Sequence, residues 1–149
     1  MGLITVLGAA GRFFGLGWGA PYYHFHIDEH FVFLGGLAIR DDFFPAAQSP
    51  KFFMYSPLPM YALIGLLEAY EAVFGPLDLA SKQDGITFMV MGRAISATLG
   101  AATIPLVFLI ATKVSGRVAG LLAATLMAAG VLHLRDSHFF SVDVSLTFF

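Results

Sequence analysis

A dense group of ionisable side chains follows two tyrosines near the start of the chain. Three imidazoles and two carboxylates stand within seven positions, at His24, His26, Asp28, Glu29 and His30. One carboxylate of an adjacent pair can accept a proton from an attacking hydroxyl while its neighbour orients it. We therefore predict that Asp28 and Glu29 are catalytic, with His26 as a supporting residue.

The histidines of this group admit two interpretations. Imidazoles are common metal ligands, but zinc sites draw their ligands at recognised spacings, and the sequence contains no matching set elsewhere. The other interpretation is an interfacial loop whose aromatic residues anchor it and whose polar groups are hydrated. The sequence implies no cofactor, and binding of a divalent metal stays an open alternative.

A second polar group lies between residues 133 and 143. Arg135 and His138 are three residues apart and would share one helical face, where two cations can bind a phosphate. Arg93, at the start of an uncharged stretch, is a third candidate for the same role. Asp143 stands beside an apolar run and is a candidate supporting residue. The alternative for all four is a helix cap, a solvated loop or a charge that reaches the membrane interface.

Composition decides what kind of protein carries these groups. Of 149 residues, 58% are hydrophobic and 12% are charged, against roughly 45–50% and 25% in soluble domains. The net charge of -2 provides no basic surface for nucleic acid. The absence of Cys excludes disulfide frameworks, thiol catalysis and Cys-ligated zinc. We conclude that this is an all-α, integral membrane protein.

The apolar stretches divide the chain into elements. We expect a first membrane helix over residues 1–18, with Arg12 near its end extending to the interface. An external loop with juxtamembrane helices is expected over residues 19–92, and the start of a further helix over 144–149. Between them, helices over 93–112 and 118–134 form a hairpin. Its connector, Lys113 to Arg117, carries two cations and no acid, which places it in the cytoplasm.

Both arms of this hairpin have a face suited to close packing. Small residues recur at every fourth position, at Gly92, Ser96 and Gly100 and at Gly120, Ala124 and Ala128. This spacing lets membrane helices approach each other closely.

The segment from Pro57 to Phe74 is apolar but carries Glu68 and Glu71 on one helical face. An acid at the centre of a spanning helix costs about 2.5 to 3.5 kcal/mol, whereas a helix lying at the interface keeps such a face hydrated. If this helix does not cross the membrane, both polar groups lie on the external side.

Four stretches, residues 12–29, 49–61, 92–97 and 132–143, together resemble the bacterial GT-C glycosyltransferases of the protein O-mannosyltransferase-like group. They occur in the order and at the spacing of that family. The resemblance implies a multi-pass glycosyltransferase of the plasma membrane that takes a sugar from a polyprenyl-phosphate donor at the external face. The transfer would invert the configuration of the anomeric carbon. The acceptor would be a lipid, a glycan or a protein.

The resemblance also implies roles for single residues. Asp28 matches the family's proposed base, with Glu29 as its neighbour, and Arg93 matches the arginine that opens the second membrane helix. In the family, the helix between Tyr55 and Phe74 is an external juxtamembrane element. Relatives run to several hundred residues, so we expect this chain to be the N-terminal part of a longer enzyme and inactive alone.

Two alternatives come from other functional classes. A fragment of a proton- or ion-coupled transporter would also use interfacial acids and histidines, although the sequence has no internal repeat. A truncated transferase that has lost its activity is the other alternative.

Overall fold

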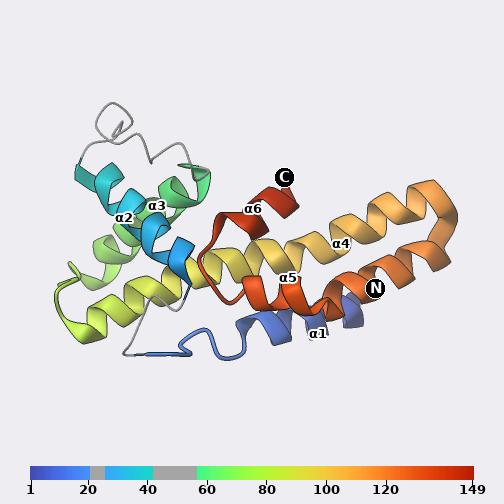
Figure 1. The fold of residues 1–149 in the computed structure, drawn as a ribbon, viewed down its shortest axis with the longest axis horizontal. Coiled ribbons are helices and arrows are strands. Elements are labelled where there is room, and N and C mark those ends of the chain that lie inside the picture. Colours follow the sequence, from blue (N-terminus) through green and yellow to red (C-terminus); the bar gives the residue numbers. More distant parts are fainter. Residues whose placement is uncertain (21–25, 42–56) are drawn as a thin grey trace.

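The computed structural model describes residues 1–20, 26–41 and 57–149, and these form helices and turns without a strand. The helices are α1 (Gly2–Phe13), α2 (Ile27–Asp41), α3 (Pro57–Phe74), α4 (Lys82–Ala129), α5 (Val131–Asp136) and α6 (Val142–Phe148). Figure 1 shows α1, α4, α5 and α6 along one long axis, with α2 and α3 gathered at one end. The prediction of an all-α fold is confirmed.

Helix α4 is a hairpin. Gly116 adopts φ 84° and ψ 174°, a conformation that favours glycine, and the chain reverses there (Figure 1). The first arm begins at Lys82, before the predicted residue 93, because the Ser81 hydroxyl accepts a hydrogen bond from the Asp84 amide at 3.1 Å and caps the helix. The second arm ends at Ala129, before the predicted residue 134, and α5 follows it.

Within the described residues, α4 is the one helix that is long and apolar enough to cross a membrane. Helix α1 is apolar but shorter. It ends at Phe13, before the predicted residue 18, because Gly15 and Gly19 take φ values of 79° and 86°. The segment after α1 is therefore a series of turns that leads toward α2.

Helix α1 packs between the arms of the hairpin. A Cβ atom on Gly8 would collide with Ile104 of the first arm and lie 3.1 Å from Ala128 of the second. On α4, a Cβ on Gly120 would collide with Thr112 of the opposite arm. The glycines therefore allow backbones to approach closely, as their spacing indicates.

Arg12 does not extend to the interface as expected from the sequence. Its side chain is buried and donates hydrogen bonds to the carbonyl oxygens of Gly8, Met127 and Ala128 at 2.9, 3.0 and 3.3 Å. Nη2 also lies 2.9 Å from Nδ1 of His133. Carbonyl groups at the end of a helix lack intrahelical partners, so Arg12 satisfies the end of α4 and stabilises the break before α5.

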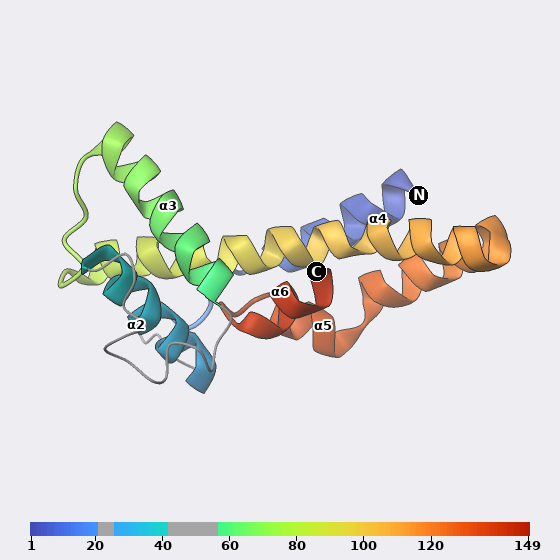
Figure 2. The same cartoon turned by 90° about the horizontal axis from the view of Figure 1, so that it is seen from above.

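Helices α2 and α3 form a separate lobe around the start of α4 (Figure 2). Its core contains Val32 of α2, Leu63 and Leu67 of α3, Phe88 of α4 and Phe140, which precedes α6. This apolar cluster is what places the start of α2 against α4.

The two acids of α3 pair with a neighbouring helix. Arg40 of α2 donates a hydrogen bond to Glu71 at 2.7 Å, and its Nε lies 3.6 Å from Glu68. Glu68 stays exposed, whereas Glu71 is largely covered. The charged face of α3 is thus directed toward α2 as well as toward solvent.

Candidate active site

A buried ion pair joins α2 to α4. Nε and Nη2 of Arg93 donate to the two carboxylate oxygens of Glu29 at 2.7 and 2.9 Å, and both side chains are almost fully buried. Nη1 donates to the carbonyl oxygens of Leu16 and Trp18 at 2.9 and 2.7 Å. Arg93 therefore holds the turn after α1, the start of α2 and the first arm of α4 together.

Glu29 has a third partner. Its Oε1 accepts a hydrogen bond from the backbone amide of Phe140 at 3.1 Å. The Phe140 ring packs on Phe33 with ring centres 5.2 Å apart, and it comes so close to Gly92 that a Cβ there would lie 2.8 Å from the ring. The carboxylate of Glu29 is therefore buried, and it accepts hydrogen bonds from Arg93 and from the Phe140 amide.

Asp28, its neighbour in sequence, faces outward. Its side chain is 37% exposed in the first turn of α2, and Oδ2 lies 3.8 Å from Nδ1 of His26. The His26 ring in turn lies 5.4 Å from the ring of Phe139. The start of α2 therefore separates the acid pair, with Glu29 directed into the protein and Asp28 accessible to solvent.

The three predicted phosphate-binding residues meet at one cavity. It has a volume of about 250 Å³ and is lined by Trp18, Arg93, Arg135, His138 and Phe139. Arg93 reaches it from the first arm of α4, whereas Arg135 and His138 come from α5 and the turn that follows. Asp28 does not line this cavity. It lies beside His26, whose ring contacts Phe139 of the cavity wall.

Arg135 and His138 differ in how they are held. Arg135 is 58% exposed and pairs only with the adjacent Asp136 among the contacts resolved for it, at 2.7 Å. The two ring nitrogens of His138 lie 2.8 and 2.9 Å from the carbonyl oxygens of Leu134 and Phe14. Both ring nitrogens of His138 are therefore directed at backbone acceptors.

Three further predictions concern Asp143, His24 and a bound metal ion. Asp143 is exposed in the first turn of α6 and does not line the cavity. His24 lies outside the described residues. Residues 1–20, 26–41 and 57–149 contain no group of three or more His, Asp or Glu side chains that could hold a metal ion.

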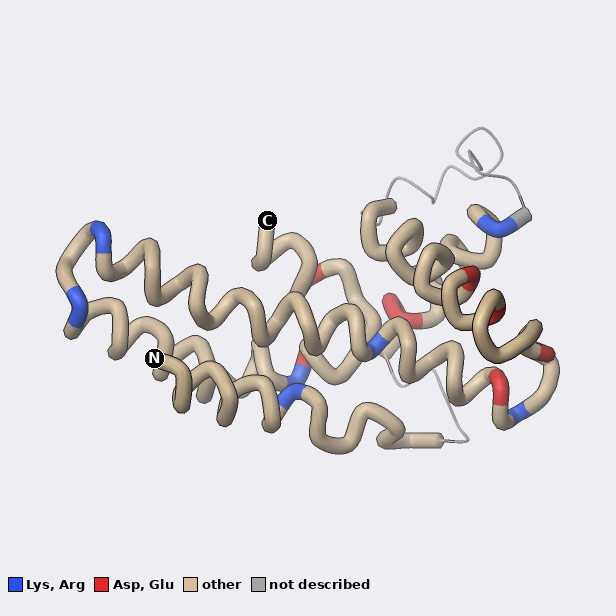
Figure 3. The backbone as a smooth tube through the Cα atoms, turned by 180° about the vertical axis from the view of Figure 1, so that it is seen from behind, with Lys and Arg blue, Asp and Glu red and all other residues tan. Residues whose placement is uncertain are grey.

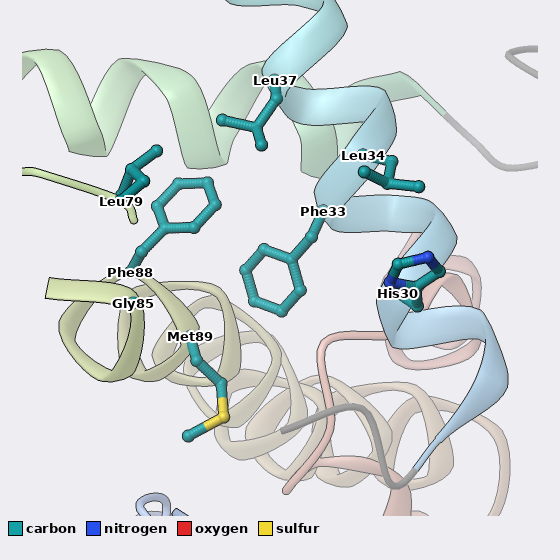
Figure 4. A pocket seen from close by; sticks show the side chains of 8 residues that line it. All are labelled: His30, Phe33, Leu34, Leu37, Leu79, Gly85, Phe88 and Met89. Carbon is teal, nitrogen blue, oxygen red and sulfur yellow. The ribbon is translucent and has the colours of Figure 1, made fainter. Parts of the chain in front are cut away.

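A second cavity, of about 150 Å³, lies between α2 and the start of α4 (Figure 4). Its wall is apolar except for His30, whose ring stands at one side, while Phe33 and Phe88 pack against each other with ring centres 5.1 Å apart (Figure 4). No Arg or Lys lines it, so it is a poor site for a phosphate.

The charges are unevenly distributed along the molecule. Figure 3 shows acidic residues concentrated around α2, α3 and the start of α4, and only basic residues at the hairpin tip. Those basic residues are Lys113 and Arg117. The candidate site therefore lies well away from the cationic connector.

Sequence reasoning did not single out Trp18 and Phe139, the aromatic residues of the cavity wall. Trp18 lies within the stretch 12–29 and Phe139 within the stretch 132–143, but nothing in their spacing indicates that they meet. Gly15 and Gly19, on either side of Trp18, were the available signal, because glycines at this spacing indicate turns. Both take positive φ, and the Trp18 carbonyl oxygen between them lies 2.7 Å from Arg93.

Comparison with known proteins identifies the group to which the chain belongs. Searches of the curated proteins and of the solved structures found no match. The model of the dolichyl-phosphate-mannose-protein mannosyltransferase family, however, matches residues 20–149, a stretch that contains the acid pair and three residues of the cavity wall, Arg93, Arg135 and His138. The chain therefore belongs to the dolichyl-phosphate-mannose-protein mannosyltransferase family of membrane glycosyltransferases.

Proposed function

We propose that this chain carries the donor phosphate site and the catalytic base of an inverting glycosyltransferase that uses a polyprenyl-phosphate-linked sugar at the external membrane face. The observation that supports this proposal best is the cavity shared by Arg93, Arg135 and His138, residues from distant parts of the sequence. Cations gathered in a partly dry site stabilise the charge that develops on a leaving phosphate.

The reaction leaves negative charge on the carrier phosphate and releases a proton from the acceptor hydroxyl. The acceptor oxygen attacks the anomeric carbon of the donor sugar, and the bond from that carbon to the phosphate oxygen breaks. The electron pair of the broken bond stays on the carrier phosphate, which Arg135 stabilises. His138 lies beside Arg135 in the cavity, but both of its ring nitrogens are directed at backbone carbonyl oxygens. Asp28, being accessible, takes the proton of the acceptor hydroxyl.

Arg93 and Glu29 act on this reaction through other residues. The hydrogen bonds of Arg93 are directed to Glu29 and to two backbone carbonyls, so little donor capacity is left for a phosphate. We assign both members of the pair as positioning residues: they fix the start of α2, and hence Asp28, against α4. Arg135, with its exposed guanidinium, is the principal phosphate ligand.

Substitution of Arg135 tests the phosphate site. Arg135→Lys keeps the charge but loses the bidentate geometry, and Arg135→Ala loses both. Because hydrogen bonds to charged groups contribute about 1.5 to 3 kcal/mol, we expect Arg135→Ala to raise the Kd for dolichyl phosphate about ten- to hundredfold, with Arg135→Lys in between.

The measurement is a titration of the chain in lipid nanodiscs with dolichyl phosphate. Arg117→Ala is the matched control, because it removes an exposed arginine from the hairpin tip. An Arg135→Ala variant that binds as tightly as Arg117→Ala would contradict the phosphate site.

The proposed topology places the lobe of α2 and α3 outside and the hairpin tip in the cytoplasm. The chain has no Cys, so single Cys substitutions can be placed without background. Gln83 and Ser115 are both exposed. In intact cells, we expect an impermeant thiol reagent to label Gln83→Cys and to label Ser115→Cys only after the membrane is opened. The reverse pattern would overturn the topology.

A further inference from the structure

One wall of the cation-lined cavity is aromatic. Trp18 and Phe139 both line it, with ring centres 6.5 Å apart and ring planes at 83°. Trp18 is 60% exposed, so a large aromatic surface is presented beside Arg135 and His138. No role in the mechanism above uses this surface.

The aromatic wall is held in place by the ion pair. The carbonyl oxygen of Trp18 accepts a hydrogen bond from Arg93 at 2.7 Å, which fixes the backbone at that residue. The guanidinium carbon of Arg93 lies 5.5 Å from the centre of the Phe139 ring, and His26 contacts the same ring. Both aromatic residues are therefore tied to the element that positions Asp28.

A sugar phosphate has two chemically different parts. Its phosphate is anionic, whereas the C–H groups on one face of the sugar ring form a small apolar surface with slight positive charge. The face of an aromatic ring is negative and apolar, so it attracts such a surface. A cavity with cations and aromatic rings side by side matches both parts at once.

We infer that Trp18 and Phe139 form the subsite for the sugar ring of the lipid-linked donor, next to the phosphate held by Arg135. This inference rests on the proposed function. It assigns Trp18 to the sugar and therefore predicts that Trp18 distinguishes a donor that carries a sugar from a carrier that has lost it.

The experiment compares two ligands. The chain in lipid nanodiscs is titrated with dolichyl-phosphate mannose and, separately, with dolichyl phosphate. Because aromatic contacts contribute about 0.5 to 1.5 kcal/mol, we expect Trp18→Leu to raise the Kd of the mannose-bearing donor about two- to tenfold and to leave the Kd of dolichyl phosphate unchanged. Trp18→Phe, which keeps an aromatic face, recovers most of the lost affinity.

Phe14→Leu is the matched control, since Phe14 is an exposed aromatic residue of the same segment that does not line the cavity. Trp18 is also the only tryptophan in the chain. In the unsubstituted protein, its fluorescence is expected to change with dolichyl-phosphate mannose far more than with dolichyl phosphate, a readout that does not depend on how the variants fold.

Three outcomes would overturn the inference. Equal weakening of both ligands by Trp18→Leu would place Trp18 against the lipid or the phosphate. No weakening of either would make Trp18 an interfacial anchor only. Equal fluorescence changes would likewise contradict a sugar contact. Failure of the proposed function has a different signature, because Arg135→Ala would then leave the binding of both ligands unchanged.

Discussion

Replacement of Asp28 by Asn is expected to lower sugar transfer by about two to four orders of magnitude, the usual contribution of a positioned general base. Asn keeps the size and polarity of the side chain but cannot accept the proton of the acceptor hydroxyl. Asp28 lies in the first turn of α2 with 37% of its side chain exposed, so the stability of the variant is measured alongside its activity. Because the chain is expected to be inactive alone, the measurement is the initial rate of mannose transfer from dolichyl-phosphate mannose in membranes that contain the longer enzyme of which it would form a part, normalised to the amount of that enzyme.

Two further variants make this result specific. Asp143→Asn removes another exposed carboxylate, one that does not line the cavity, and we expect it to retain most of the activity. Glu29→Gln is expected to act mainly on stability, because Glu29 is enclosed. Activity of Asp28→Asn within a few-fold of the unsubstituted protein would remove Asp28 from the mechanism, and a larger loss of rate with unchanged stability in Glu29→Gln would move the role of base to Glu29.

Loss of either member of the buried pair is expected to cost about 3 to 5 kcal/mol of stability, because the remaining charge is left buried without its partner. Arg93→Ala leaves Glu29 with the Phe140 amide as its one hydrogen-bond donor among the contacts described here. Glu29→Ala leaves Arg93 with two backbone carbonyls. The measurement is the loss of folded protein on heating in detergent, followed by size-exclusion chromatography.

The partly exposed pair of Arg40 and Glu71 is the control. Arg40→Ala breaks a salt bridge of the same 2.7 Å length near the surface, where such pairs contribute about 0.2 to 1 kcal/mol. Replacing Glu29 and Arg93 together by Met is expected to recover part of the loss, because no lone charge remains. A Glu29→Ala variant as stable as Arg40→Ala would contradict the structural role of the pair.

Features that depend on neighbouring residues could be predicted from the sequence. The apolar composition indicates a helical membrane protein, and the segment from Pro57 to Phe74 forms a helix with the expected bounds. The reversal between the two arms of α4 occurs at Gly116, within the predicted connector. Helix ends were predicted less well, because capping by Ser81 and the turns at Gly15 and Gly19 depend on backbone angles that hydropathy does not report.

The chemical candidates were also visible in the sequence, because rare charges stand out in an apolar chain. Asp28 and Arg93 were recognised by type and by resemblance to a family, and Arg135 by its spacing from His138. The sequence did not show which of these side chains are buried and which are accessible to a substrate. Asp28 and Glu29 are adjacent, yet successive residues of a helix point in different directions, so one faces solvent and the other is buried.

Only the tertiary structure decided which groups meet. Arg93 and Glu29 are 64 positions apart, and Arg12 lies 115 positions from the carbonyl group of Met127. Such pairings follow from how whole helices pack, and packing depends on the shapes of many side chains at once. The sequence by itself therefore determined the class of protein and the residues capable of chemistry. The fold decided that Arg93 holds Glu29 and that Trp18 lines the same cavity as Arg135 and His138.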